Sequence, residues 1–193
     1  MNGLTVKRED AVLAVIDFQV NMLAAIYGKD KIEDLSARFI KGCRILGVPI
    51  LVTQQYTKGL GPTTEKITEA LTCEIPEVLP AADFRSIEKT TFSAMKEPAF
   101  AQALSETGRK TVILTGVETH ICVQQTALDL IEAGYNVFGV LDCMSSRTLE
   151  NKEFGQIRMT QSGVIVTGYE SVLFEMLIDA KDASFKQISR IVK

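Results

Sequence analysis

The stretch TVILTGVETHICVQQTALDLIEAGYNVFGVLD (111–142) contains a helical pattern between two short apolar runs. The runs TVILTG (111–116) and YNVFGVLD (135–142) are typical of strands that are buried on both faces. A strand, a helix and a second strand in this order predict a right-handed crossover between two parallel strands. The helical pattern is an apolar stripe made by Ile121, Ala127, Leu128 and Ile131.

The same alternation continues on both sides of this stretch. We therefore expect one domain, residues 1–193, with a doubly wound (Rossmann-like) α/β fold and a mostly parallel six-stranded sheet in the order 3-2-1-4-5-6, with helices on both faces. Further strands are predicted at AVLAVID (11–17), PILVTQ (49–54), SIEKTT (86–91) and GVIVT (163–167). Further helical stripes are formed by Ile32, Leu35, Phe39, Cys43 and Leu46, and by Val172, Leu173, Met176 and Leu177.

The composition limits the classes of partner. The 193 residues suffice for one hydrophobic core without disulfides or metals, and the four cysteines, which form no CxxC pair, are expected to be free thiols. A net charge of −3 without a Lys/Arg cluster argues against nucleic acid. MNGLTVKRED (1–10) lacks an apolar signal core and AVLAVI (11–16) is too short to span a membrane, so we expect a cytoplasmic protein without a membrane partner.

Three side chains with useful chemistry lie at predicted strand ends. In doubly wound sheets, ligands bind beyond the carboxyl ends of the strands, at the point where the strand order reverses. Asp17 ends the first strand, Lys89 lies at the end of the third, and Cys122 opens the helix after the fourth. The expected order makes the first and fourth strands neighbours, so the three side chains should converge on one crevice.

Cys122 has two interpretations. A buried cysteine usually acts as a small hydrophobic residue. The first turn of a helix, however, offers N–H groups and a dipole that lower a thiol pKa from about 8.5 to between about 3.5 and 7.5. The same N–H groups can stabilise an oxyanion. This second interpretation predicts a thiolate nucleophile at neutral pH.

A cysteine nucleophile needs a proton acceptor. His120 is two residues from Cys122 on the same turn and should project elsewhere, at the pocket mouth. Asp17 is the better base, because a carboxylate after six apolar residues is costly to bury without a task or a partner. Removal of Asp17 should then slow alkylation of the thiol, and Lys89 would lower the thiol pKa. The alternatives are a turn or helix-capping role for Asp17 and a surface position for Lys89.

Three ordered motifs resemble those of the isochorismatase-like cysteine hydrolases, over nearly the whole chain. AVIDFQ (14–19) resembles the aspartate motif of the first strand, EKTTFSA (88–94) the lysine segment, and the stretch 116–142 the nucleophile segment. Three further stretches are most similar to the isochorismatase-domain-containing subgroup. They are QQYTKGLGPT (54–63), DCMSSR (142–147) and IRMTQSG (157–163).

The resemblance implies a catalytic triad. Asp17 would be the base, Lys89 the third member and Cys122 the nucleophile. It also implies a cis peptide bond between Val117 and Glu118, which would place the N–H groups of Glu118 and Cys122 as an oxyanion hole.

The resemblance also bears on the ligands of the pocket. Gln19, Thr119 and Gln125 would shape or support a pocket for a small-molecule substrate. VTQQYTKG (52–59) lacks the histidine and carboxylates that hold a metal in nicotinamidases of the family, so we expect no metal and no other cofactor.

The resulting hypothesis is a metal-free cysteine hydrolase of the amidase type, which cleaves a C–N bond through a Cys122 thioester. Two alternatives belong to other classes. One is a non-catalytic small-molecule-binding or scaffold protein of the same fold. The other is thiol redox chemistry between Cys122 and Cys143.

A homo-oligomer is a further expectation, since the family commonly assembles. PEVLPAADF (76–84) would then offer Val78, Leu79 and Phe84 as an apolar contact surface on an exposed loop. The alternative is that these side chains fold back onto their own core.

Overall fold

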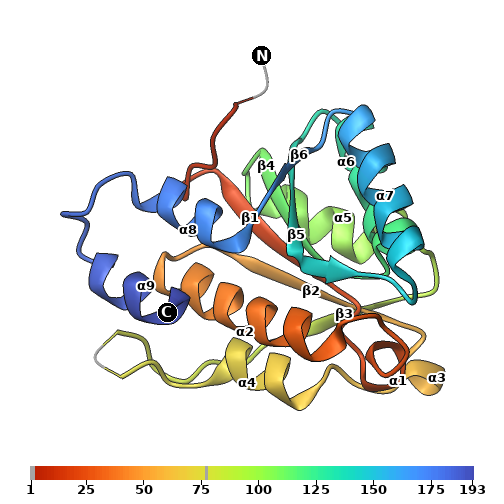
Figure 1. Cartoon of the computed structure of the whole chain (residues 1–193), viewed down its shortest axis with the longest axis horizontal. Coiled ribbons are helices and arrows are strands. Elements are labelled where there is room, and N and C mark those ends of the chain that lie inside the picture. Colours follow the sequence, from red (N-terminus) through yellow and green to blue (C-terminus); the bar gives the residue numbers. More distant parts are fainter. Residues whose placement is uncertain (1–2, 77) are drawn as a thin grey trace.

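The strands of the chain form one sheet. The structure, a computed structural model, describes residues 3–76 and 78–193. Over these residues the sheet has six parallel strands in the order β3-β2-β1-β4-β5-β6, which confirms the predicted topology (Figure 1). The strands are β1 (Ala11–Ile16), β2 (Ile50–Gln55), β3 (Ser86–Lys89), β4 (Thr111–Val117), β5 (Asn136–Ser145) and β6 (Ile165–Thr167).

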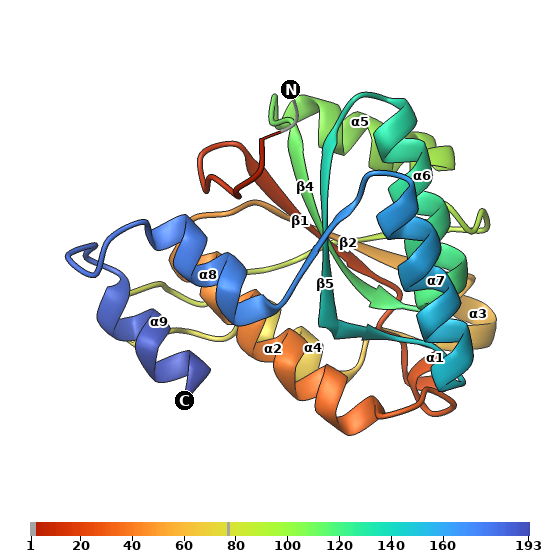
Figure 2. The same cartoon turned by 45° about the horizontal axis from the view of Figure 1, so that its top comes forward.

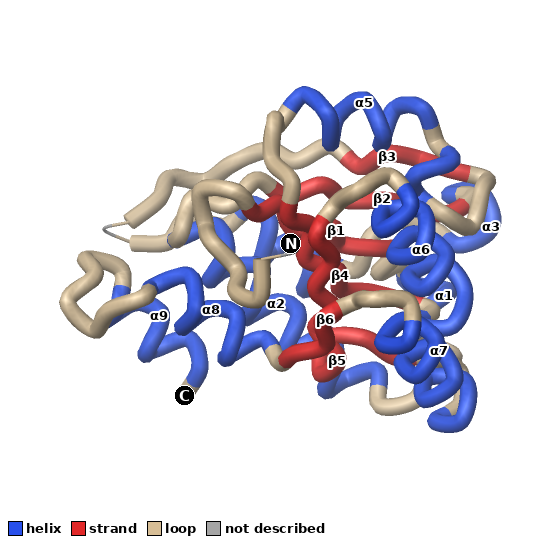
Figure 3. The backbone as a smooth tube through the Cα atoms, turned by 90° about the horizontal axis from the view of Figure 1, so that it is seen from above, coloured by secondary structure: helices blue, strands red, loops and turns tan. Residues whose placement is uncertain are grey.

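Helices cover both faces of the sheet. Figure 2 shows the strands running between two groups of helices, and Figure 3 shows the same separation from above. One group consists of α2 (Lys29–Ile45), α4 (Glu65–Thr72), α8 (Tyr169–Leu177) and α9 (Phe185–Val192). The other consists of α5 (Pro98–Glu106), α6 (Gln124–Glu132) and α7 (Leu149–Gln161).

Strand β1 lies at the centre of the sheet and is buried along its whole length. Successive side chains of a strand point to opposite faces. Residues 11, 13 and 15 therefore belong to the core beneath α2 and α8, whereas residues 12, 14 and 16 belong to the core beneath α5 and α6. Each fully buried Val, Leu or Ile side chain contributes about 1.5–3 kcal/mol. Both cores thus fix β1 in place and, with it, the residue that follows the strand.

The helix after β4 buries a different face from the one predicted. Leu130 is fully buried there, whereas Leu128 is only half-buried. The chain first forms a π-helical turn, η2 (Thr119–Val123), and only then continues as α6. A π-helical turn holds more residues than an α-helical one, so it rotates the following side chains relative to the predicted stripe.

The carboxyl edge of the sheet is bordered by short elements. Helices α1 (Val20–Leu23) and α3 (Thr57–Leu60) follow β1 and β2, and they lie side by side (Figure 1). Asn21 Nδ2 donates a hydrogen bond to the Gly59 carbonyl at 3.0 Å and so joins the two helices. The 3₁₀ turn η1 (Ala94–Lys96) follows β3. Within the described part of the chain, no helix combines the length and apolar character needed to cross a membrane.

Candidate active site

Asp17 is the first residue after β1, and it is fully buried. Its φ of 53° is left-handed, a conformation that costs a residue with a side chain about 1–3 kcal/mol. Asp17 Oδ1 accepts a hydrogen bond from Thr53 Oγ1 at 2.7 Å, and Oδ2 accepts one from Lys89 Nζ at 2.7 Å. The N-cap of the next helix is Gln19, so the helix-capping alternative for Asp17 is wrong.

Lys89 is the last residue of β3, and its side chain has no exposed surface. Its ammonium group donates to Asp17 Oδ2 at 2.7 Å and to Gln55 Oε1 at 2.6 Å. The carbonyls of Thr91 and Phe92 lie at 3.2 and 3.1 Å. A lysine has three protons, so these four acceptors occupy its whole hydrogen-bonding capacity. The alternative of a surface lysine is therefore wrong.

Cys122 is 4% exposed and lies within the π-helical turn η2. Burial raises the pKa of its thiol to about 12, and the Asp17 carboxylate adds to this rise while the Lys89 ammonium opposes it. Burial of the thiol therefore opposes the thiolate that was expected at neutral pH. Cys122 is not in the first turn of an α-helix, and the loss of hydration outweighs the nearby positive charge.

Two glycines allow η2, the turn that carries Cys122, to pack closely. Gly116 has a φ of 134°, and a Cβ at this position would overlap the Ile16 carbonyl oxygen of β1. A Cβ on Gly155 of α7 would lie 2.8 Å from His120 Cα. The turn is thus held between the end of β1 and helix α7. Sequence reasoning missed Gly155, although an isolated glycine within a helix often marks such a close approach.

The peptide bond between Val117 and Glu118 is cis. Both residues are buried, and Glu118 lies between the end of β4 and the start of η2. Glu118 Oε2 accepts hydrogen bonds from Arg147 N at 2.9 Å and Arg147 Nε at 3.1 Å. The carboxylate is therefore paired with a cation. His120 Nδ1 lies 2.9 Å from Ser146 Oγ, so the imidazole contacts the residue that follows β5.

Of the three residues expected to shape the pocket, Gln19 and Thr119 are buried and Gln125 is exposed. Gln19 is buried and supports a loop: its Nε2 donates to the Gln55 and Gly61 carbonyls at 3.0 and 2.7 Å. Thr119 is also buried, and its Oγ1 has no hydrogen-bond partner among the residues that the structure describes. Gln125 is exposed on α6, and it does not border the cavity beside Cys122. The altered phase of α6 accounts for this, since it turns Gln124 inward instead.

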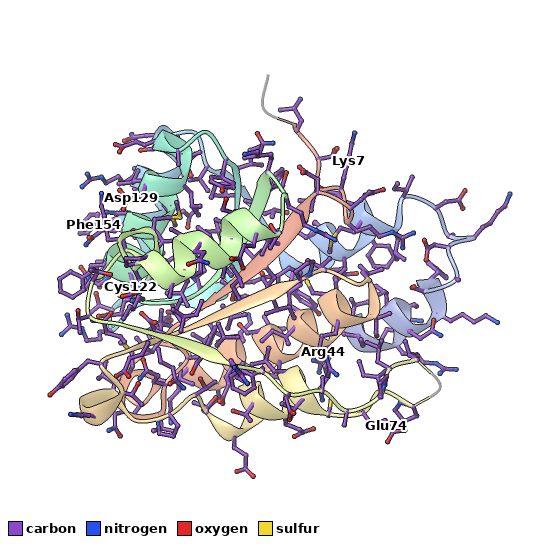
Figure 4. All side chains as sticks on the ribbon, turned by 180° about the vertical axis from the view of Figure 1, so that it is seen from behind. Lys7, Arg44, Glu74, Cys122, Asp129 and Phe154 are labelled. Atoms are coloured by element: carbon purple, nitrogen blue, oxygen red, sulfur yellow. The ribbon has the colours of Figure 1, made fainter. Side chains whose placement is uncertain are left out.

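A cavity of about 140 Å³ opens beside the Cys122 thiol. It lies between the short helices α1 and α3 and the turn η2. Figure 4 shows Cys122 far from Arg44 of α2. Sequence reasoning assigned only Glu118 and Cys122 of its lining residues to the site, since most of the others come from short helices and a strand end that periodicity does not bring together. The lining consists of Met22, Gln55, Leu60, Phe92, Glu118, Ile121 and Cys122.

The thiols of Cys122 and Cys143 lie on opposite faces of the sheet. Cys122 belongs to the core beneath α5 and α6, whereas Cys143 belongs to the core beneath α2 and α8. Both are free thiols. The redox alternative is therefore wrong, because alternate residues of β5 point to different faces and Cys143 points away from the site.

Ligands for a metal ion do not gather at the site. Over residues 3–76 and 78–193, no group of three or more His, Cys, Asp or Glu side chains is arranged to hold a metal ion. Asp17 is held instead by Thr53 and Lys89. The absence of a metal requirement stays a prediction.

Comparisons with known proteins place these features in a family. A family model described as the isochorismatase domain matches residues 11–171. The chain is 39% identical over 184 residues to isochorismatase domain-containing protein 1 of Danio rerio, covering 95% of this chain and 61% of that protein. It is 35% identical over 182 residues to isochorismatase domain-containing protein 2 of Xenopus laevis, covering 94% and 83%. The chain thus spans about three fifths of the first of these relatives.

Solved structures share the fold. A structure described as the MAR1 ribonuclease from Caenorhabditis elegans has a TM-score of 0.87 and 32% identity, covering 97% of this chain and 92% of that chain. The YcaC gene product of Escherichia coli, described as an octameric hydrolase of unknown specificity, has a TM-score of 0.86 and covers 99% and 92%. The latter likeness, at 22% identity, concerns the fold alone.

Proposed function

The chain belongs to the isochorismatase family, and we propose that it is a metal-free cysteine hydrolase that cleaves the C–N bond of a small, uncharged amide or a related carbonyl compound. One observation carries the proposal. Asp17 and Lys89 form a fully buried ion pair, and the Cys122 thiol, whose pKa both groups influence, borders a cavity. A buried ion pair beside a thiol suits a proton acceptor and a nucleophile.

In the proposed reaction, the proton of the Cys122 thiol moves to the Asp17 carboxylate as the sulfur attacks the carbonyl carbon. The raised thiol pKa means that this transfer accompanies attack and does not precede it. Lys89 stabilises the negative charge that develops on the sulfur as its proton leaves, and the N–H groups of Glu118 and Cys122 would stabilise the oxyanion. Asp17 then gives the proton to the departing amine, which leaves a thioester. Water, deprotonated by Asp17, hydrolyses the thioester and restores the thiol.

The cavity favours a small and neutral substrate. Its volume of about 140 Å³ is below the roughly 300–1,000 Å³ of sites for drug-sized ligands. Met22, Leu60 and Ile121 supply apolar walls. The cations nearby are already engaged, because Lys89 has four acceptors and Arg147 pairs with Glu118. A substrate carboxylate would therefore find no counter-charge in this cavity.

A panel of amides tests the proposed activity. We expect ammonia release from formamide, acetamide or propionamide, and none from succinamate, which has similar chemistry but carries a charge. Ammonia is measured with a coupled enzyme assay. If small amides bind, seen as a raised melting temperature, but none is hydrolysed, the alternative of a non-catalytic binding protein replaces the proposal.

A second candidate, RNA cleavage, is favoured by the description of the Caenorhabditis elegans structure as a ribonuclease. The net charge of −3 and the engaged cations of the cavity do not meet the electrostatic needs of a polyanion. Single-stranded RNA is therefore added to the panel. RNA cleavage by the wild-type protein that a Cys122→Ser variant lacks would contradict both the amide proposal and the prediction of no nucleic-acid partner.

We also propose a homo-oligomer, but through another surface than the one predicted. Val78, Leu79 and Phe84 are half-buried, and Phe84 packs against the core beneath α2; Glu77 of this segment lies outside the described residues. Helix α7 instead exposes 65% of Phe154 and 52% of Ile157 (Figure 4 labels Phe154). The two residues are three positions apart on one helix, so they lie on the same face, and adjacent exposed apolar side chains are typical of contact surfaces.

The prediction for assembly concerns these two side chains. We expect light scattering to give a multiple of the chain mass for the wild type and a smaller mass for the variant with Phe154→Lys and Ile157→Lys. Leu4→Lys, which changes an 82% exposed apolar residue elsewhere, serves as the control and should not alter the mass. A single-chain mass for the wild type at micromolar concentration would rule out the oligomer.

The expected cytoplasmic location stays a prediction.

A further inference from the structure

A second and larger cavity, of about 480 Å³, lies between the start of α2, the end of β5 and helix α7. It shares no lining residue with the cavity beside Cys122. The lining consists of Tyr27, Gly28, Lys31, Ile32, Leu141, Asp142, Ser145, Lys152 and Gln156.

Two lysines give this cavity an excess of positive charge. Lys31 comes from the first turn of α2 and Lys152 from the first turn of α7, and neither forms an ion pair within the described residues. Lys152 is half-buried. Burial lowers the pKa of Lys152, Asp142 opposes this effect, and Lys31 adds to it. Two ammonium groups that repel each other across a cavity would both be stabilised by an anion between them.

The carboxylate of Asp142 is partly engaged elsewhere. Its Oδ1 and Oδ2 lie 3.0 and 3.3 Å from the backbone nitrogen of Tyr169, which donates from the first turn of α8. The cavity therefore has two ammonium groups against one carboxylate that a helix N-terminus already stabilises. Helix α2 begins beside the cavity with Gly28 as its N-cap, and the dipole of this 17-residue helix adds positive potential.

We propose that this cavity is a second binding site, for a small organic anion with an apolar body. A carboxylate or phosphate group would lie between Lys31 and Lys152, where charge-assisted hydrogen bonds from both ammonium groups can reach it. The side chains of Ile32 and Leu141 and the ring of Tyr27 would contact the apolar part. The site is independent of the proposed amide hydrolysis, because it uses none of the residues assigned to that reaction.

A titration of the whole chain tests the site. The probes are benzoate and phenyl phosphate, which distinguish a carboxylate from a phosphate, and benzyl alcohol, a neutral compound of similar size. Binding is followed at constant ionic strength by two-dimensional amide NMR. We expect either anion to shift the signals of residues 28–32 and 152–156, and benzyl alcohol to leave them unchanged.

Lysine variants test whether Lys31 and Lys152 contact the bound anion. Lys31→Met and Lys152→Met should each weaken binding of the anion by about tenfold, the value of one hydrogen bond to a charged group. Lys29→Met is the control: Lys29 lies in the same turn of α2 but does not line the cavity, and this variant should bind as the wild type does. Equal binding by Lys31→Met, Lys152→Met and Lys29→Met would overturn the proposal. The proposal would also be overturned if the anions shifted only the NMR signals of residues 118–122, or if benzyl alcohol bound as tightly as the anions.

Discussion

A Cys122→Ser variant is expected to fold as the wild type does and to lose turnover by a factor on the order of 10³ or more. A hydroxyl is a much weaker nucleophile than a thiol, and the members of the proposed triad would act as one unit. Serine differs from cysteine by one atom, so the buried turn should keep its packing. Turnover of the best amide of the panel and the circular dichroism spectrum are the measurements. Retained ammonia release with an unchanged spectrum would show that another group performs the chemistry.

The pH dependence of alkylation separates the roles of Asp17 and Lys89. With a thiol pKa of about 12, the rate of Cys122 alkylation by iodoacetamide should rise with pH throughout the accessible range, by about tenfold per unit, because only the thiolate reacts. Asp17 raises this pKa, so Asp17→Asn should shift the curve to lower pH and speed alkylation while it abolishes turnover. This reverses the expectation from the sequence, which treated Asp17 only as a base and not as a nearby negative charge.

Lys89 acts in the opposite direction. Its ammonium lowers the thiol pKa, so Lys89→Met should shift the alkylation curve to higher pH and also reduce turnover. Peptide mass spectrometry assigns the modified cysteine, since Cys43, Cys73 and Cys143 are also free. Superimposed curves for the wild type, Asp17→Asn and Lys89→Met would mean that the ion pair does not influence the thiol.

Lys89→Met is also expected to lower the free energy of unfolding by about 3–5 kcal/mol, since it leaves the Asp17 carboxylate buried without a counter-charge. This is a large share of the roughly 5–15 kcal/mol that stabilises a typical domain. Urea unfolding followed by circular dichroism measures the change. Asp17→Asn combined with Lys89→Met removes both charges, so we expect the double variant to recover part of the loss while it stays inactive.

A surface ion pair supplies the control for this stability effect. Lys96 Nζ lies 3.4 Å from Asp129 Oδ1, and the Lys96 side chain is 65% exposed. Lys96→Met should change stability by about 0–1 kcal/mol, because water screens an exposed pair. If Lys96→Met and Lys89→Met had equal effects, burial of the Asp17–Lys89 pair would have no energetic consequence and the site would need another explanation.

The sheet, and the placement of Asp17 and Lys89 at its carboxyl edge, follow from the sequence pattern alone. Apolar runs and helical stripes predicted the strand order, because parallel strands need buried crossovers of one hand. The same order brought Asp17 and Lys89, 72 positions apart, to one edge of the sheet. Periodicity identifies the strands and helices, and the usual strand order of doubly wound sheets supplies their arrangement.

The environment of the Cys122 thiol and the shape of the cavity beside it depend on tertiary packing. The thiol pKa depends on how completely the neighbours exclude water and on the distances to two charges, and neither follows from local pattern. The π-helical turn η2, which placed Gln125 in solvent, is held by β1 and by Gly155 of α7. Both cavities are likewise formed by segments that are distant in the chain. Lys31 and Lys152 face the same cavity only once α2 and α7 have packed together.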